Sequence, residues 1–108
     1  MANTYKVLGQ IEPTAASATT LYTTPSATST VCSTLIVCNK GVSTLYRVAV
    51  RPAGASLEDK HYIVYNAAIN QYDSIFLTLG ITMAATDVLT VYASTADVSF
   101  NLFGSEVT

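Results

Sequence analysis

Charged side chains are scarce in this chain. Lys, Arg, Asp and Glu make up 11% of its 108 residues, less than half of the share of about 25% in an average soluble protein. Five basic residues stand against seven acidic ones, for a net charge of −2 with His neutral. This balance excludes a strongly basic nucleic-acid binder, whose affinity rests on neutralising phosphates, and a polybasic membrane-surface protein. We therefore expect no nucleic acid and no membrane among its partners.

The groups that carry catalysis and metal binding are also scarce. His61 is the single histidine, and no G-x-S-x-G, C-x-x-C, H-x-x-x-H or Asp-rich calcium-loop pattern occurs. The five glycines stand apart, so no phosphate-binding loop is present. Glu58 and Asp59 are adjacent, and adjacent side chains point apart, so we expect a solvated loop there. The sequence thus predicts no catalytic, metal-binding or cofactor-binding residue, and a chain that is not an enzyme.

Long apolar runs are missing. Lys6 is followed only by Val7 and Leu8 before Gly9, so no signal-peptide core is expected. No run approaches the roughly 18 apolar residues of a membrane span. We expect a soluble chain made in a cytoplasm.

The two cysteines, Cys32 and Cys38, lie in one strand-like run at 29–39. Six residues of strand separate them by roughly 20 Å, whereas a disulfide needs Cα atoms within about 7 Å. They therefore cannot pair with each other or share a tetrahedral metal. Their even spacing predicts one shared strand face. We expect buried free thiols, in keeping with a reducing compartment.

Residues typical of β-strands are abundant. The chain has sixteen Thr, eleven Val and seven Tyr, and β-branched and aromatic side chains suit a pleated surface. Short alternating segments recur about every ten residues, which is typical of an all-β fold. We predict a single-domain antiparallel β-sandwich (1–108) of seven to nine short strands, either jelly-roll or immunoglobulin-like. The expected strands are 5–11, 19–23, 29–39, 43–51, 61–66, 74–79 with a continuation at 81–83, 88–93 and 98–103.

Two further expectations concern how these segments pack. The Thr/Ser-rich stretch 12–30 reads as an irregular arm that contains the short strand 19–23 and could order against a neighbour. Strand 29–39 has apolar residues on both faces, which predicts a central strand covered on both sides. Val31, Leu35 and Val37 are expected on one face of this strand, and Cys32, Ile36 and Cys38 are expected on the other.

A hydroxyl-rich surface with little charge is easier to bury against another protein than a charged one. We therefore expect much of it to be covered in the working assembly; the alternative is a Thr-rich monomer with an ordinary surface. Arg47 and Arg51 are expected on the same face of their strand. Their guanidinium groups are either solvated or paired with carboxylates of a neighbouring subunit. Tyr62 and Tyr65 are expected on opposite faces of their strand. The candidate interface residues are Tyr46, Arg47, Arg51, Tyr62 and Tyr65.

Several segments resemble small virion proteins of tailed bacteriophages, in particular cyanophage and marine-phage structural proteins. They are the opening MANTYKVLGQ at 1–10, LYT at 21–23, VCN at 37–39, RVAVRPAG at 47–54, TDVLTVYAS at 86–94 and SFNLFG at 99–104. The resemblance covers nearly the whole chain and carries no functional residues over.

That resemblance implies a repeated, non-enzymatic building block of a virion, assembled in the host bacterial cytoplasm. Such proteins are commonly capsid decoration (cement) proteins, often trimers that bind the major capsid protein. Others belong to the tail, fibre or baseplate. The alternative function is therefore a component of one of these structures, which could include a module that binds the host.

Overall fold

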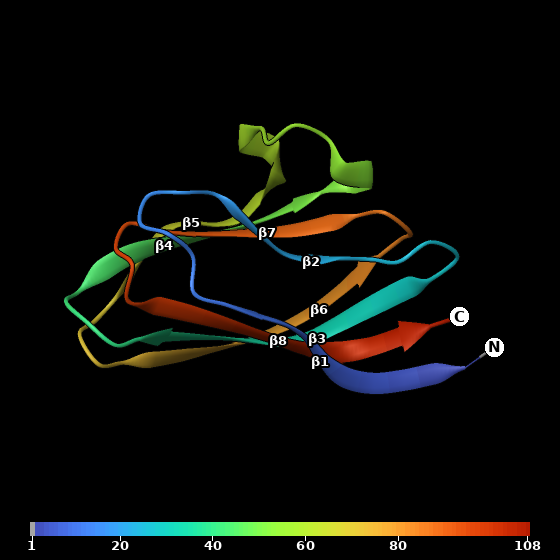
Figure 1. Ribbon diagram of the computed structural model, residues 1–108, viewed down its shortest axis with the longest axis horizontal. Helices are drawn as coiled ribbons and strands as arrows, with labels where there is room; N and C mark the ends of the chain where they lie inside the picture. Colours follow the sequence, from blue (N-terminus) through green and yellow to red (C-terminus); the bar gives the residue numbers. More distant parts are fainter. Residues whose placement is uncertain (1) are drawn as a thin grey trace.

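The computed structural model describes residues 2–108, which fold into two four-stranded antiparallel sheets packed face to face (Figure 1). The predicted all-β sandwich is confirmed. Sheet A has the strand order β1 (Asn3–Ile11), β8 (Val98–Val107), β3 (Ser29–Asn39) and β6 (Ser74–Met83). Sheet B has the order β2 (Thr19–Thr23), β7 (Val88–Ala93), β4 (Thr44–Arg51) and β5 (Tyr62–Ile69).

The strand order selects one of the two topologies that the sequence left open. The first and last strands are neighbours in sheet A, and β1, β2, β3 and β4 alternate between the sheets. Eight strands in two four-stranded sheets with these crossovers form a jelly roll. An immunoglobulin-like sandwich instead keeps its first two strands in one sheet.

Two short 3-10 turns, η1 (Pro52–Gly54) and η2 (Asp59–His61), join β4 to β5 and project beyond sheet B at the top of Figure 1. The two chain ends lie side by side, because Ala2 and Thr108 exchange backbone hydrogen bonds of 3.0 Å. Within residues 2–108, no helix is long and apolar enough to cross a membrane.

The core fills the space between the sheets with side chains from every strand. Tyr46 and Phe100 meet at its centre, with ring centroids 6.4 Å apart. Aliphatic residues from both sheets surround them, among them Leu35, Val48 and Leu102, all without solvent exposure. A jelly roll of this size is therefore held mainly by apolar burial.

The stretch 12–30 is irregular on either side of one short strand, as expected, and its irregular parts pack against the sandwich. The predicted strand 19–23 is present as β2 and pairs with β7. On either side of it, the Ala16 N–H donates to the Ala93 carbonyl (2.8 Å) and the Thr24 N–H to the Asp87 carbonyl (2.9 Å). Thr24 and Thr28 are buried. Backbone pairing thus holds the segment against its own chain.

A β-bulge in β3 corrects the predicted faces of that strand. The pairing of β3 with both neighbours shifts between Cys32 and Thr34, so Ser33 is an extra residue. A bulge of this kind reverses the alternation that follows it. Cys32 therefore points into the core with Leu35 and Val37, whereas Cys38 points outward and is half-exposed. The prediction that the two thiols share a face was wrong; both are free.

The last strand is longer than predicted, because Gly104 continues it. The sequence predicted a strand at 98–103, but β8 runs through Gly104 to Val107. Gly104 lies between Lys6 of β1 and Cys32 of β3, where an added Cβ would overlap the backbone carbonyl oxygen of Val31. Glycine here allows close strand packing and does not form a turn.

Candidate functional site

Of the five candidate interface residues, Tyr46 lies in the wrong place for that role. Its side chain is 2% exposed and packs on Phe100 between the sheets. It belongs to the inward-facing row of β4, as the alternation of that strand predicts. This correction removes Tyr46 from any surface, because it has no area to offer to a partner.

Arg51 supports the local fold. Its Nε donates to Thr90 Oγ1 (3.0 Å) on the neighbouring strand, and its Nη1 donates to the Ala55 carbonyl (2.9 Å). A third contact, from Nη1 to the Gly54 carbonyl, measures 3.5 Å. These bonds hold the chain that leaves β4 against sheet B, so most of this guanidinium is already engaged.

Tyr62 and Tyr65 lie on the same side of sheet B, which corrects the prediction of opposite faces. Their rings meet edge to face with centroids 4.9 Å apart. The pairing of β5 with β4 is irregular on both sides of Val48, and the positive φ of Asn66 (51°) marks one of these irregularities. Two bulges therefore interrupt the alternation of β5 and bring the two rings together.

Arg47 lies at the centre of a cluster on the outer face of sheet B, which we call the Arg47 cluster. Its guanidinium carbon is 4.2 Å from the ring centroid of Tyr92, 4.5 Å from that of Tyr65 and 6.0 Å from that of Tyr62. Its Nε donates to Asn66 Oδ1 (2.7 Å). Cation–π contacts and one hydrogen bond thus fix the position of a side chain that is usually mobile.

The single histidine caps a turn. The imidazole of His61 is 7% exposed, and its Nδ1 accepts a hydrogen bond of 3.0 Å from the Glu58 backbone N–H. The Glu58 carboxylate lies 3.9 Å from the ammonium of Lys60, and both are largely solvated. This segment therefore organises η2.

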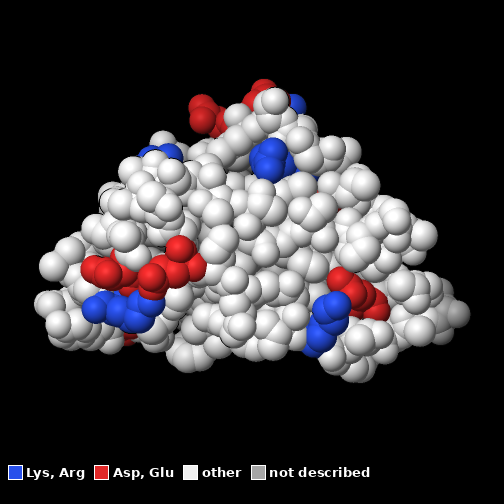
Figure 2. Space-filling model, viewed as in Figure 1, with Lys and Arg blue, Asp and Glu red and all other residues white. Residues whose placement is uncertain are grey.

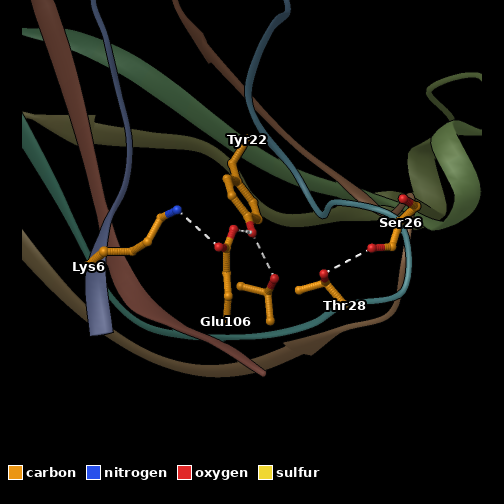
Figure 3. Close-up of polar contacts among 6 residues, drawn as sticks. Lys6, Tyr22, Ser26, Thr28 and Glu106 are labelled. Atoms are coloured by element: carbon orange, nitrogen blue, oxygen red, sulfur yellow. Dashed lines mark hydrogen bonds and ion pairs between the residues drawn. The ribbon is translucent and has the colours of Figure 1, made fainter. Parts of the chain in front are cut away.

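A polar network closes the end of the sandwich where the chain ends meet (Figure 3). Glu106 of β8 accepts hydrogen bonds from the Lys6 ammonium of β1 (3.0 Å) and from the Tyr22 hydroxyl of β2 (2.5 Å). The Tyr22 hydroxyl lies 2.8 Å from Thr30 Oγ1 of β3. Since Tyr22 gives its only proton to Glu106, Thr30 is the donor to Tyr22. The network joins β2 of sheet B to three strands of sheet A.

The network shifts the pKa values of its members. Burial, followed by the hydrogen bond to Glu106, raises the pKa of Tyr22 to about 12. The hydrogen bonds from Tyr22 and then Lys6 lower the pKa of the Glu106 carboxyl. Outside the network, burial alone raises the pKa of the Cys32 thiol to about 11. Each shift keeps the group in the protonation state that the fold needs at neutral pH, and none activates a nucleophile.

The outer face of sheet A carries no charge. The four strands of this sheet contain two charged residues, Lys6 and Glu106, which pair with each other in the network described above. The residues that point outward include exposed apolar side chains, of which Tyr5 is 81% exposed and Phe76 is 68% exposed. Val7 and Val31 add to this surface, and hydroxyl groups such as Thr78 fill the rest.

The size of this face matches a protein contact. Four strands about 4.8 Å apart and ten residues long cover about 600 Å² of flat area. Each partner in a standard-size interface buries about 800 Å². A shallow depression lies between Tyr5, Val31 and Phe103. Figure 2 shows that the charged groups visible from the side gather in a few small clusters, most of them with both signs, and leave wide uncharged areas between.

No protein-family model matches the chain, and comparison with curated proteins and with solved structures found no match. The surfaces described above therefore carry the functional argument, because a jelly roll by itself hosts many functions. Across residues 2–108, no group of three or more His, Cys, Asp or Glu side chains could hold a metal ion.

Sequence reasoning missed parts of both surfaces. Tyr92 and Asn66 belong to the Arg47 cluster, but Tyr92 lies opposite Arg47 only because β7 pairs with β4 in that register. The uncharged face was missed because its four strands are not consecutive in the chain. A signal was present: the segments 29–39 and 74–83 contain no charged residue at all.

Proposed function

We propose that this protein is a structural component of a bacteriophage virion, and specifically a capsid decoration protein that bridges capsid subunits. The observation that carries the proposal is the uncharged outer face of sheet A. The resemblance of several segments to phage virion proteins supports the biological setting of this proposal, and the uncharged face of sheet A supports the choice of contact surface.

The physical argument concerns the cost of covering this face. Burying a charge without a partner costs several kcal/mol, whereas burying apolar groups releases roughly 25 cal/mol per Å². The outer face of sheet A has exposed Tyr5 and Phe76 and no charge to desolvate. Eight of the twelve charged residues lie outside the strands altogether. Docking by this face therefore gains apolar burial at little electrostatic cost.

The proposed partners are the major capsid protein and other copies of this chain, with a homotrimer favoured, and the proposed location is the virion. Arg47 and Arg51 lie on the opposite side of the sandwich from the proposed contact. A repeated small unit that covers subunit boundaries stabilises the capsid without any chemical step.

The proposal is tested by quantitative mass spectrometry of purified virions. A decoration protein is expected at hundreds of copies per particle. A handful of copies would contradict this role and would favour the tail, fibre or baseplate. Absence from the particle would overturn any virion role.

A pair of matched variants tests the contact face itself. Phe76→Glu places a charge on the outer face of sheet A, where Phe76 is 68% exposed, and Tyr72→Glu places one at a loop residue that is 76% exposed. Both variants are expected to fold. Phe76→Glu should lower binding to particles that lack the protein by at least tenfold, and Tyr72→Glu should not. Equal binding of both would show that sheet A is not the contact.

A further inference from the structure

The Arg47 cluster is a second surface, separate from the proposed capsid contact. It lies on the outer face of sheet B, whereas the uncharged face belongs to sheet A on the other side of the sandwich. A protein held by sheet A would turn this cluster toward the solvent. The inference below concerns the isolated protein and does not depend on the virion role.

The surroundings of Arg47 leave one edge of its guanidinium available. The rings of Tyr92 and Tyr65 lie 4.2 and 4.5 Å from the guanidinium carbon, and Nε is engaged by Asn66 Oδ1 at 2.7 Å. The two Nη groups have no acceptor among residues 2–108. Parallel N–H donors on one edge of a guanidinium match the two oxygens of a carboxylate.

Arg47 also differs from the three lysines in its charge pairing. Lys6, Lys40 and Lys60 each lie within ion-pair distance of a glutamate of this chain. Arg51 donates to three neutral oxygens. No carboxylate within the described part of the chain pairs with Arg47. Arg47 is thus a guanidinium held in place by aromatic rings, and no carboxylate of residues 2–108 matches its charge.

The adjoining surface shows what else the ligand must carry. Asp59, Tyr62 and Tyr65 line a shallow depression of ≈ 360 Å³ beside the cluster, a size within the usual range of about 300–1,000 Å³ for small-ligand sites. Tyr65 is 57% exposed, so part of its ring is open for stacking. The Asp59 carboxylate can accept hydrogen bonds from hydroxyl groups, but it repels a second anionic group.

We propose that the Arg47 cluster binds an acidic saccharide. The sugar carboxylate accepts hydrogen bonds from the Nη groups of Arg47, an apolar C–H face of the sugar ring stacks on Tyr65, and ring hydroxyls donate to Asp59. A single carboxylate on a polyhydroxylated ring satisfies all three groups. An acidic peptide supplies several carboxylates and few hydroxyls, so it fits Asp59 poorly.

The test measures binding of the isolated protein to oligosaccharides that end in glucuronic acid or sialic acid, and to their carboxyl-reduced counterparts. We expect the acidic form of at least one of them to bind 10- to 100-fold more tightly than its reduced form, since a hydrogen bond to a charged group is worth about that factor. Equal affinity for both forms, or no binding of any acidic form at millimolar concentration, would overturn the proposal. Tighter binding of polyglutamate would overturn it in favour of an acidic protein segment.

Matched variants assign the binding to the cluster. Arg47→Gln and Lys60→Gln each remove one positive charge, but Lys60 is a solvated residue of η2 that makes no contact with the Arg47 guanidinium. We expect Arg47→Gln to weaken binding of the acidic sugar at least tenfold and Lys60→Gln to weaken it less than twofold. Arg47→Lys keeps the positive charge but removes the paired N–H donors of the guanidinium, so it should also weaken binding of the acidic sugar. Equal effects of Arg47→Gln and Lys60→Gln would mean that net charge, and not this site, attracts the sugar.

Discussion

Replacing Tyr22 by Phe removes one hydroxyl from the network that joins the two sheets. That hydroxyl donates to Glu106 at 2.5 Å and lies 2.8 Å from Thr30 Oγ1, in a residue that is 7% exposed. A hydrogen bond to a charged group contributes about 1.5–3 kcal/mol, and the buried Thr30 hydroxyl, which has no exposed surface, loses its acceptor as well. We expect Tyr22→Phe to lower the free energy of unfolding by about 2–4 kcal/mol.

Urea denaturation at pH 7 measures this loss, and Tyr5→Phe is the matched control. Tyr5 loses the same hydroxyl at a position that is 81% exposed, so a change below about 0.5 kcal/mol is expected there. The melting temperature of Tyr22→Phe should fall by roughly 10–20 °C for a domain of this size. A loss within about 0.5 kcal/mol of the Tyr5→Phe value would refute the role given to the network.

The same variant has an alkaline signature. The pKa of Tyr22 is raised to about 12 in the folded protein, from an ordinary value of 10.0. The protonated phenol therefore contributes stability that is complete below pH 10 and is lost as the pH rises toward 12. The Tyr22→Phe variant has no phenol at this position, so its free energy of unfolding should fall less between pH 10 and pH 12. An identical slope in both proteins over that range would contradict the hydrogen-bond assignment.

Three further predictions concern the acid range, the close strand packing and the bulge. Because the pKa of Glu106 is lowered in the folded protein, its carboxylate stabilises the fold above the unfolded pKa, and this stability is lost as the pH falls through the folded pKa. In Glu106→Gln, the urea midpoint of unfolding should therefore fall less steeply as the pH is lowered into the acid range. Gly104→Ala should cost more than about 3 kcal/mol because of the overlap with the Val31 carbonyl, whereas Gly80→Ala, with φ +65° and open space, should cost about 1–2 kcal/mol. A thiol reagent should modify Cys38 in the folded protein and reach buried Cys32 only on unfolding; equal rates would contradict the bulge.

The strands could be predicted from the sequence, but their faces could be predicted only in part. Alternation identified 29–39 and 88–93 with their observed bounds as β3 and β7. It failed wherever an extra residue interrupts the pairing, as at Ser33 and around Asn66. A bulge is defined by the partner strand as well as by its own sequence, so a single segment does not reveal it.

Both candidate surfaces depend on pairing between distant segments. Arg47 meets Tyr92 because β4 and β7 are neighbours, and Asn66 reaches the guanidinium through a bulge. The scarcity of charge in the composition predicted a covered surface, but only the strand order brings the uncharged segments 29–39 and 74–83 together in one sheet. Composition thus indicated the kind of surface, and topology determined where it lies.

The most direct test of a covered sheet A uses Cys38, whose side chain points outward from that sheet. The rate at which a small alkylating reagent modifies Cys38 is compared between the isolated protein and purified virions. A Val42→Cys variant, at a loop position that is 61% exposed, reports the general access of the reagent. Slowing of Cys38 by at least tenfold in the virion, with Val42→Cys little changed, is the predicted result. An unchanged rate at Cys38 would contradict the account, because sheet A would then remain open in the particle.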